Sequence, residues 1–229
     1  MESPAAEALR DYFETLRAEL GPQHWWPARK QFEVIVGAIL TQNTAWVNVE
    51  RAMANLRRAR LLSTGAMERV SLPRLERKVR PSGYFRQKAK KLKAFLGFLR
   101  ANFGGSLAQM FRTPPEELRA MLLEVYGIGP ETADSILLYA GRLPVFVVDA
   151  YTRRILLRHE LISEQAEYEE IRQLFERSLP RDAAQWNEYH ALLVQVGKNW
   201  CRPGTPRCKE CPLAAYLPAD ARRKIKAGA

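Results

Sequence analysis

Cysteine is scarce in this sequence, and no apolar stretch is long. Only Cys201, Cys208 and Cys211 occur among 229 residues, all within eleven positions. Such an odd, clustered set argues against a disulfide framework and favours a metal site. No apolar run approaches the roughly 20 residues that a membrane-spanning helix needs, so no membrane association is expected. The N-terminal stretch 1–20 lacks the apolar core of a signal peptide, and the chain is therefore expected to be cytoplasmic.

Acidic residues are outnumbered by basic ones. The chain has 36 Lys and Arg against 25 Asp and Glu, which gives a formal net charge of +11. Such a field concentrates polyanions near the surface, so nucleic acid is the first candidate partner. Charge does not set the fold, however, and a basic protein without a nucleic-acid partner has the same balance. The length allows one large domain or two small ones, and a hydrophobic content of 47% is enough for a core.

Strand patterns are also nearly absent, and the predicted fold class is all-α. Only Val145–Val148 resembles a strand, and it is too short to found a sheet. Elsewhere apolar residues recur at helical spacing. Asn43-Thr44 is expected to cap one helix. Further helices are predicted at Ala150–His159, Glu167–Ser178 and Ala183–Trp200.

One predicted helix carries a lysine-rich face opposite an apolar one. The apolar face contains Leu92, Phe95, Leu96 and Leu99, and the outer face carries Lys88, Lys90, Lys91 and Lys93. A face of this kind is ordinarily a solvated helix surface. We favour a DNA-facing role, with Lys88 as a DNA contact, because of the motif that follows.

A glycine-rich turn joins two predicted amphipathic helices at residues 124–133. Gly127 and Gly129 permit backbone angles that other residues avoid, and Ile128 between them can fill the core under the turn. The next helix begins with N–H groups at its positive end, which form a ready site for a phosphate. Ordinary helix connections use glycine as well. The two flanking helices and the Thr132-Ala133 pair favour the DNA-binding interpretation, in which phosphate contacts hold DNA without reading its sequence.

With these residues the chain resembles the endonuclease III-like superfamily of helix-hairpin-helix DNA glycosylases, over nearly its whole length. The resemblance implies two helical domains flanking a DNA cleft. A six-helix domain with the hairpin would cover residues 28–140. The second domain would combine residues 1–27 and 141–229 and include a cysteine loop at 201–217. The implied partner is double-stranded DNA containing damaged bases, bound by a monomer that associates with the nucleoid.

Asp149 follows the apolar stretch Pro144–Val148 and precedes a predicted helix. An aspartate there can simply cap that helix. The resemblance adds a catalytic role, and both roles can hold together. Rupture of an N-glycosidic bond builds positive charge on the sugar, which a nearby carboxylate stabilises while it orients or activates the attacking water. The resemblance also places Glu131 opposite Asp149 across the cleft.

Glu131 stands where bifunctional members of the superfamily carry a lysine that forms a Schiff base with the sugar. A carboxylate cannot form an imine, so the sequence predicts a monofunctional enzyme without AP lyase activity. A glutamate here also suits the dipole of a helix N-terminus. It is similar to the glutamate of the endonuclease III-like 3-methyladenine DNA glycosylases, in which this residue lies in the base pocket.

Tryptophans near the N-terminus suggest a base-binding pocket. Trp25 and Trp26 resemble the tandem aromatic residues that line the pocket of that subgroup, and Trp46 falls where the subgroup places a further aromatic residue. Tryptophans are commonly core residues, which is the alternative. A pocket of indoles suits a cationic alkylated purine, because a cation over an indole face gains roughly 0.5–2 kcal/mol.

Two further residues are expected to probe the DNA duplex. Gln42 is similar to the glutamine that relatives insert into the gap left by the extruded nucleotide, where its amide can donate and accept hydrogen bonds. Tyr84, within Gly83–Lys88, resembles the wedge that enters the opposite strand. Alternatively, Tyr84 is a core residue at a helix start.

The cysteine spacing resembles the first three positions of the iron–sulfur loop of endonuclease III relatives. The fourth cysteine of that loop would fall at position 217, where this chain has Leu217. We expect a [4Fe-4S] cluster held by Cys201, Cys208 and Cys211 with an unidentified fourth ligand. Zinc, which three thiolates and one other ligand also satisfy, and the absence of any metal are the alternatives.

Together these features predict a monofunctional DNA glycosylase of base excision repair that acts on alkylated purines such as 3-methyladenine. One alternative, an endonuclease III-like glycosylase for oxidised or mismatched pyrimidines, keeps the fold and changes the pocket. Another is a DNA-damage-binding protein without catalytic activity.

Overall fold

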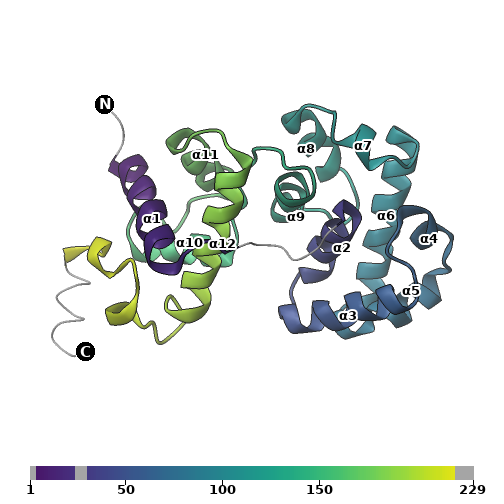
Figure 1. The fold of residues 1–229 in the computed structure, drawn as a ribbon, viewed down its shortest axis with the longest axis horizontal. Helices are drawn as coiled ribbons and strands as arrows, with labels where there is room; N and C mark the ends of the chain where they lie inside the picture. Colours follow the sequence, from purple (N-terminus) through teal and green to yellow (C-terminus); the bar gives the residue numbers. More distant parts are fainter. Residues whose placement is uncertain (1–3, 24–29, 220–229) are drawn as a thin grey trace. The chain divides into compact units, whose positions relative to one another are not determined.

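The structure is a computed structural model that describes residues 4–23 and 30–219. All regular elements in these residues are helical, and no strand occurs among them, so the all-α prediction is confirmed. The chain divides into a central unit, Trp26–Leu143, and a terminal unit, Met1–Trp25 with Pro144–Ala229. Figure 1 shows the elements of each unit. Within the described residues, no helix combines the length and the apolar character needed to cross a membrane.

The central unit contains the hairpin predicted from the glycines. The hairpin joins α8 (Pro115–Leu123) to α9 (Pro130–Ser135), and α9 runs on into the π-helical turn η2 (Ile136–Ala140). The other elements of this unit are α2 (Gln31–Thr41), α3 (Trp46–Arg58), α4 (Thr64–Arg69), α5 (Leu72–Val79), η1 (Arg80–Ser82), α6 (Phe85–Phe103) and α7 (Leu107–Met110).

Helix α2 forms the centre of this unit. Phe32 and all residues of 34–40 are buried, as expected of a helix that is apolar on every side. It packs against α3, α6, α9 and η2. Its C-terminal end therefore lies next to the hairpin and carries Gln42 as its C-cap residue.

A buried ion pair fixes the two helices of the hairpin to each other. Arg119 of α8 donates to both carboxylate oxygens of Asp134 in α9, at 2.6 and 3.1 Å. The side chains are only 8% and 0% exposed. A bidentate pair of this kind restricts orientation as well as distance, so it holds α9 against α8.

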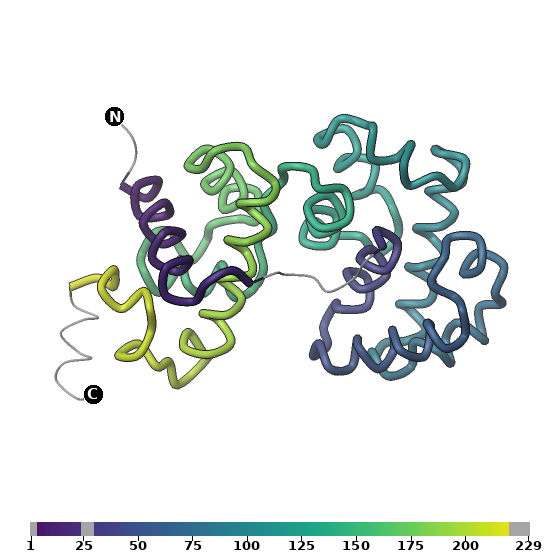
Figure 2. The backbone as a smooth tube through the Cα atoms, in the orientation of Figure 1, coloured from purple at the N-terminus to yellow at the C-terminus, as the bar shows by residue number. Residues whose placement is uncertain are grey.

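The terminal unit is built from both ends of the chain. It comprises α1 (Pro4–Leu20), α10 (Ala150–Arg158), α11 (Tyr168–Ser178), α12 (Ala183–Asn199), η3 (Cys208–Glu210) and η4 (Ala214–Tyr216). Helix α1 packs against α11 and α12, and Figure 2 shows this purple helix beside the green segments. The core includes Phe146, which stacks on Phe175 with ring centroids 3.9 Å apart.

The predicted helices at 150–159, 167–178 and 183–200 match α10, α11 and α12 to within one residue at each end. The predicted cap at Asn43-Thr44 is wrong. Helix α3 has Ala45 as its N-cap without a side-chain bond, and Asn43 instead adopts a left-handed turn with φ of 51°. Val145–Val148 is buried but belongs to no strand.

Candidate nucleic-acid interface and catalytic carboxylate

The structure requires a glycine at one of the two glycine positions of the hairpin and not at the other. Gly127 has φ of 79°, and a Cβ there would lie about 2.5 Å from the methylenes of Lys91. Gly127 is therefore required both by its backbone angle and by a close neighbour. Gly129 has an ordinary φ of −96°, which corrects the expectation of an unusual angle, and a Cβ there would meet nothing within 4 Å. Ile128 is 4% exposed and fills the core, as expected.

Gln42 is hydrogen-bonded to the hairpin. Its Nε2 donates to the carbonyl oxygen of Gly127 at 3.0 Å and to Oγ1 of Thr132 at 2.8 Å. Its Oε1 accepts a hydrogen bond from Nζ of Lys91. The side chain thereby connects the end of α2, the hairpin and α6, and both the donor and the acceptor of the amide are used.

Tyr84 is an exposed residue, which decides against the core alternative. It lies in the turn between η1 and α6 with φ of 44° and ψ of 32°, and it is 67% exposed. Left-handed angles are costly for a residue with a bulky side chain. Phe85 follows as the first residue of α6, with the guanidinium groups of Arg80 and Arg86 within 6.0 Å of its ring centre.

The predicted outward lysine face of α6 is largely turned inward, and the expectation that Lys88 contacts DNA is corrected. Lys88 is 2% exposed. Its Nζ donates to the carbonyl oxygens of Leu40 at 2.9 Å and Ser82 at 2.6 Å. Burial, with a smaller effect of Lys91, lowers the pKa of Lys88 to about 8. An ammonium enclosed in this way cannot reach a phosphate.

Other lysines of α6 behave similarly. Lys93 donates to the carbonyl oxygens of Met67, Glu68 and Val70, at the C-terminal end of α4. Such carbonyls have no partner inside their own helix, and a cation there also suits the helix dipole. Lys90, by contrast, is exposed.

Asp149 caps α10, as one of the two sequence interpretations predicted. Its Oδ1 accepts a hydrogen bond from the backbone N–H of Thr152 at 2.8 Å. Its side chain is 14% exposed, and its Oδ2 lies 3.7 Å from Nε2 of His190 in α12. One carboxylate oxygen is thus fixed by the helix, and the other lies near an imidazole in a side chain that is mostly buried.

His190 was missed by the sequence analysis. It is 5% exposed, and burial lowers its pKa even though the carboxylate of Asp149 raises it. A histidine on an otherwise apolar helix face was the available signal. Gly197 allows α12 to approach α10, since a Cβ at Gly197 would lie 2.3 Å from the ring of Tyr151.

The proposed base-pocket residues are only partly described. Trp25 and Trp26 lie outside the described residues. Trp46 is the first residue of α3 and is half-buried. Glu131 is exposed in the first turn of α9, where the helix dipole favours a negative charge.

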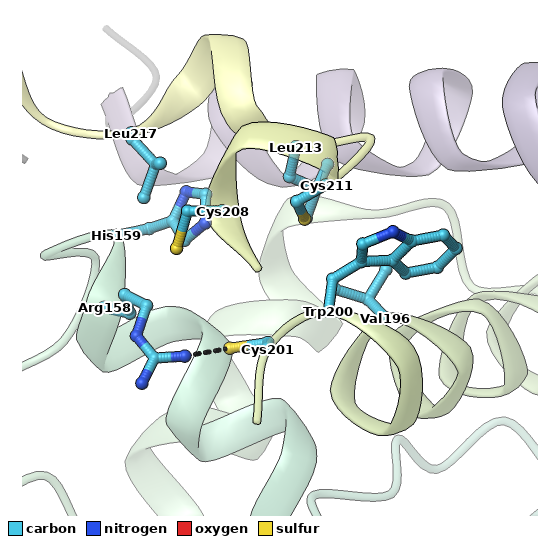
Figure 3. Close-up of a pocket in the computed structure, with 9 residues that line it drawn as sticks. All are labelled: Arg158, His159, Val196, Trp200, Cys201, Cys208, Cys211, Leu213 and Leu217. Carbon is cyan, nitrogen blue, oxygen red and sulfur yellow. Dashed lines mark hydrogen bonds between the residues drawn. The ribbon is translucent and has the colours of Figure 1, made fainter. Parts of the chain in front are cut away.

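The three cysteines line one pocket of the terminal unit, shown in Figure 3. They are free thiols, and Nη1 of Arg158 donates to Sγ of Cys201 at 2.9 Å. Burial raises the pKa of Cys211 to about 11. His159 and Leu217 line the same pocket, and Leu217 is 3% exposed.

The described residues contain no ready-made group of ligands for a single metal ion. In residues 4–23 and 30–219, no three His, Cys, Asp or Glu side chains gather closely enough to hold one. A tetrahedral zinc has bonds of about 2.3 Å to thiolates, and three thiolates with one further ligand would satisfy it. A [4Fe-4S] cluster distributes its ligands over four irons, and the donor set of the pocket fits that chemistry.

Two of the solved structures that match this fold are DNA repair enzymes. A non-covalent endonuclease III–DNA complex matches with a TM-score of 0.81 over 98% of this chain and 100% of that chain, at 19% identity, which shows the fold. The 3-methyladenine DNA glycosylase of H. pylori, bound to 1,N6-ethenoadenine, matches with a TM-score of 0.74. It is 28% identical, and the match covers 85% of this chain and 97% of that chain.

Sequence comparison identifies the family. The family model described as HhH-GPD superfamily base excision DNA repair protein matches residues 36–181. A Methanocaldococcus jannaschii protein named as a DNA repair glycosylase is 43% identical over 218 residues, which cover 94% of this chain and 98% of that protein. Endonuclease III of Thermotoga maritima is 27% identical and covers 84% of each chain. The chain belongs to the HhH-GPD superfamily of base excision DNA repair proteins.

Proposed function

We propose that this protein is a monofunctional DNA glycosylase that hydrolyses the N-glycosidic bond of alkylated purines such as 3-methyladenine. The observation that carries the proposal is the geometry of Asp149. The N–H of Thr152 fixes one carboxylate oxygen, the other lies beside His190, and the side chain as a whole keeps some exposure to solvent. A carboxylate held in one orientation can stabilise developing charge without reorganising during the reaction.

The proposed reaction follows from the charge that develops on the sugar. As the glycosidic bond breaks, its electron pair moves to the cationic purine, which leaves as a neutral base. The sugar becomes positive, and the Asp149 carboxylate stabilises that charge. Water then bonds to the sugar carbon and loses a proton to the carboxylate or to solvent, which leaves an intact abasic site.

Glu131 supports the absence of lyase activity. It occupies the position at which the resemblance places the Schiff-base lysine, and no carboxylate can form that imine. Lys88 is not a substitute, because both carbonyls that it contacts hold it inside the central unit.

An alkylated purine is supported by the similarity to the H. pylori enzyme at 28% identity and by the tryptophans. Trp25, Trp26 and Trp46, with Glu131, are proposed as the base pocket, since indole faces and a carboxylate both suit a cation. Tyr84 is proposed to enter the duplex, and so is Gln42, whose amide would exchange its hydrogen bonds to the hairpin for bonds to DNA. Gly127 and Gly129 are proposed to hold the phosphate backbone, while Ile128 fills the core beneath them.

The test compares defined lesions in duplex DNA. The protein is incubated with DNA containing 3-methyladenine, oxidised pyrimidines or mismatched uracil and thymine, with and without alkali. We expect free 3-methyladenine, and strand breaks only after alkali. Release of pyrimidines instead would assign the endonuclease III-like alternative, and strand breaks without alkali would contradict the argument from Glu131. Damage-specific binding without release would indicate a non-catalytic protein.

We also propose that Cys201, Cys208 and Cys211 hold a [4Fe-4S] cluster. Leu217 has no ligand atom, and His159 is the one other residue lining this pocket with a side chain that commonly binds metals. His159 is therefore the proposed fourth ligand. Its Nδ1 lies 2.7 Å from the hydroxyl of Tyr12, a contact that would orient the ring.

Anaerobic purification with iron and sulfide analysis and visible absorbance tests the cluster. Leu217→Cys, which supplies a fourth thiolate, is expected to give more iron per chain, and His159→Ala less. Cys208→Ser is the control for loss of a ligand. Colourless wild-type protein without iron after reconstitution would rule the cluster out. Equal iron in wild type and His159→Ala would remove His159 as a ligand.

A further inference from the structure

Lys88 occupies an unusual place for a lysine. Its side chain is buried at 2% exposure, and its ammonium donates to the carbonyl oxygens of Leu40 and Ser82. Burying an ammonium costs free energy unless its donors are satisfied. A methionine or leucine would fill an apolar space of this size at a lower cost in free energy. The hydrogen bonds of the Lys88 ammonium therefore need an explanation.

Both carbonyls immediately precede the segments proposed to enter the duplex. Leu40 lies two residues before Gln42, at the end of α2, and Ser82 lies two residues before Tyr84, in η1. Leu40 and Ser82 are far apart in the sequence, and Lys88 Nζ bonds to both. The ammonium therefore fixes the end of α2 against the turn that carries Tyr84.

The turn at Tyr84 needs such support. Tyr84 has a left-handed φ of 44°, and angles of this kind cost about 1–3 kcal/mol and persist only where the surroundings impose them. Lys88 holds the turn twice, since its backbone N–H donates to the carbonyl oxygen of Tyr84 at 3.0 Å while its side chain holds Ser82. Ser82 is itself fully buried, and its hydroxyl donates to Val79.

The next turn of α6 extends the same arrangement. Lys91 donates to Oε1 of Gln42, and its methylenes lie against Gly127 of the hairpin. Three residues apart on a helix, Lys88 and Lys91 lie on one face. That face of α6 thus supports the Gln42 segment, the Tyr84 turn and the hairpin together.

We propose that Lys88 is a positioning residue that sets the spacing between Gln42 and Tyr84, so that both can enter a damaged duplex at once. This inference rests on the proposed function, specifically on the entry of Gln42 and Tyr84 into DNA. It replaces the phosphate contact that the sequence suggested for Lys88 with an internal role.

The test uses Lys88→Met, which keeps the approximate length and removes the charge. Lys90→Met is the matched control, because it removes the same charge from an exposed position of the same helix. The probe is a duplex with 2-aminopurine opposite a tetrahydrofuran abasic analogue. Its fluorescence reports intrusion into the stack without any base excision, so the readout does not depend on glycosylase activity.

We expect Lys88→Met to reduce the fluorescence change at saturating protein at least fivefold. Lys90→Met should leave it unchanged while weakening affinity in a salt-dependent way. In a double-mutant cycle, the effect of Lys88→Met should disappear in a Tyr84→Ala background. Independent, additive effects would overturn the proposal, as would a Lys88→Met protein whose only defect is a smaller salt dependence.

Lys88→Arg provides a second variant if Lys88→Met does not fold, since it keeps the charge and moves the donors. Its coupling to Tyr84→Ala is measured in the same cycle, and absence of coupling there also overturns the proposal. If Tyr84→Ala and Gln42→Ala leave the fluorescence response intact, these residues do not enter the DNA. The proposed positioning role of Lys88 would then be wrong as well. Base release by the wild type reports separately on the glycosylase assignment.

Discussion

Substitution of Asp149 separates its two roles. In Asp149→Asn the amide oxygen can still accept the hydrogen bond from Thr152, because Asn and Asp are nearly equivalent as N-caps. Burial lowers the pKa of His190, which favours the neutral imidazole, so the substitution is expected to cost little through the contact with His190. Asp149→Asn is therefore expected to fold with a stability within a few tenths of a kcal/mol of wild type.

Catalysis should respond very differently. Removing the negative charge takes away the group that stabilises the positive sugar, and loss of one such electrostatic group commonly costs about 10²–10³ in rate. Asp149→Ala should lose activity to a similar degree. It should also lose the cap, at about 0.5–2 kcal/mol. For a chain of this size, 1 kcal/mol corresponds to roughly 2–4 °C in Tm.

The assay measures single-turnover base release from methylated duplex DNA with enzyme in excess, beside thermal unfolding of the three proteins and their affinity for undamaged DNA. We expect stability to fall in the order wild type, Asp149→Asn, Asp149→Ala. Both variants should release base about 10²–10³ times more slowly than wild type, and all three proteins should bind DNA similarly. An Asp149→Asn protein that releases base within threefold of the wild-type rate would refute the catalytic assignment. An Asp149→Ala protein as stable as Asp149→Asn would refute the contribution of the cap.

Three other predictions concern the central unit. Arg119→Ala removes the buried ion pair with Asp134 and should lower the free energy of unfolding by about 3–5 kcal/mol in denaturant titrations. The double variant Arg119→Met/Asp134→Leu should recover much of this loss, and equal instability of the single and double variants would contradict the argument. Gly127→Ala should cost at least about 1–2 kcal/mol because of its left-handed φ, with a further cost because the new Cβ would displace the methylenes of Lys91. Gly129→Ala, at an ordinary φ beside open space, should unfold like wild type. The pKa of Lys88 is lowered to about 8 in the folded chain and is about 10.4 when unfolded. Between these two pKa values the unfolded chain binds more protons than the folded chain. The free energy of unfolding of wild type should therefore rise with pH across that window relative to Lys88→Met, by up to about 3 kcal/mol. If the difference in free energy of unfolding between the two proteins does not change with pH, the ammonium is not strained by burial.

The sequence by itself determined the helical class and several local features. The bounds of α10, α11 and α12 were predictable because apolar spacing and capping residues act within a few positions of one another. The cap at Asp149 and the left-handed angle at Gly127 are local in the same sense. At Asn43-Thr44 the local signal misled, because helix α3 has Ala45, which offers no side-chain cap, as its N-cap.

Only the tertiary structure decided which polar side chains are buried. Lysine reads as a surface residue in any helical pattern, yet Lys88, Lys91 and Lys93 bond to groups at or near the ends of other elements that packing brings beside α6. His190 reaches Asp149 only because Gly197 lets α12 pack closely on α10. Such pairings join residues far apart in the chain, and no spacing rule within one helix encodes them. They depend on where packing places the carboxylates of neighbouring elements and the carbonyl groups that have no partner within their own helix.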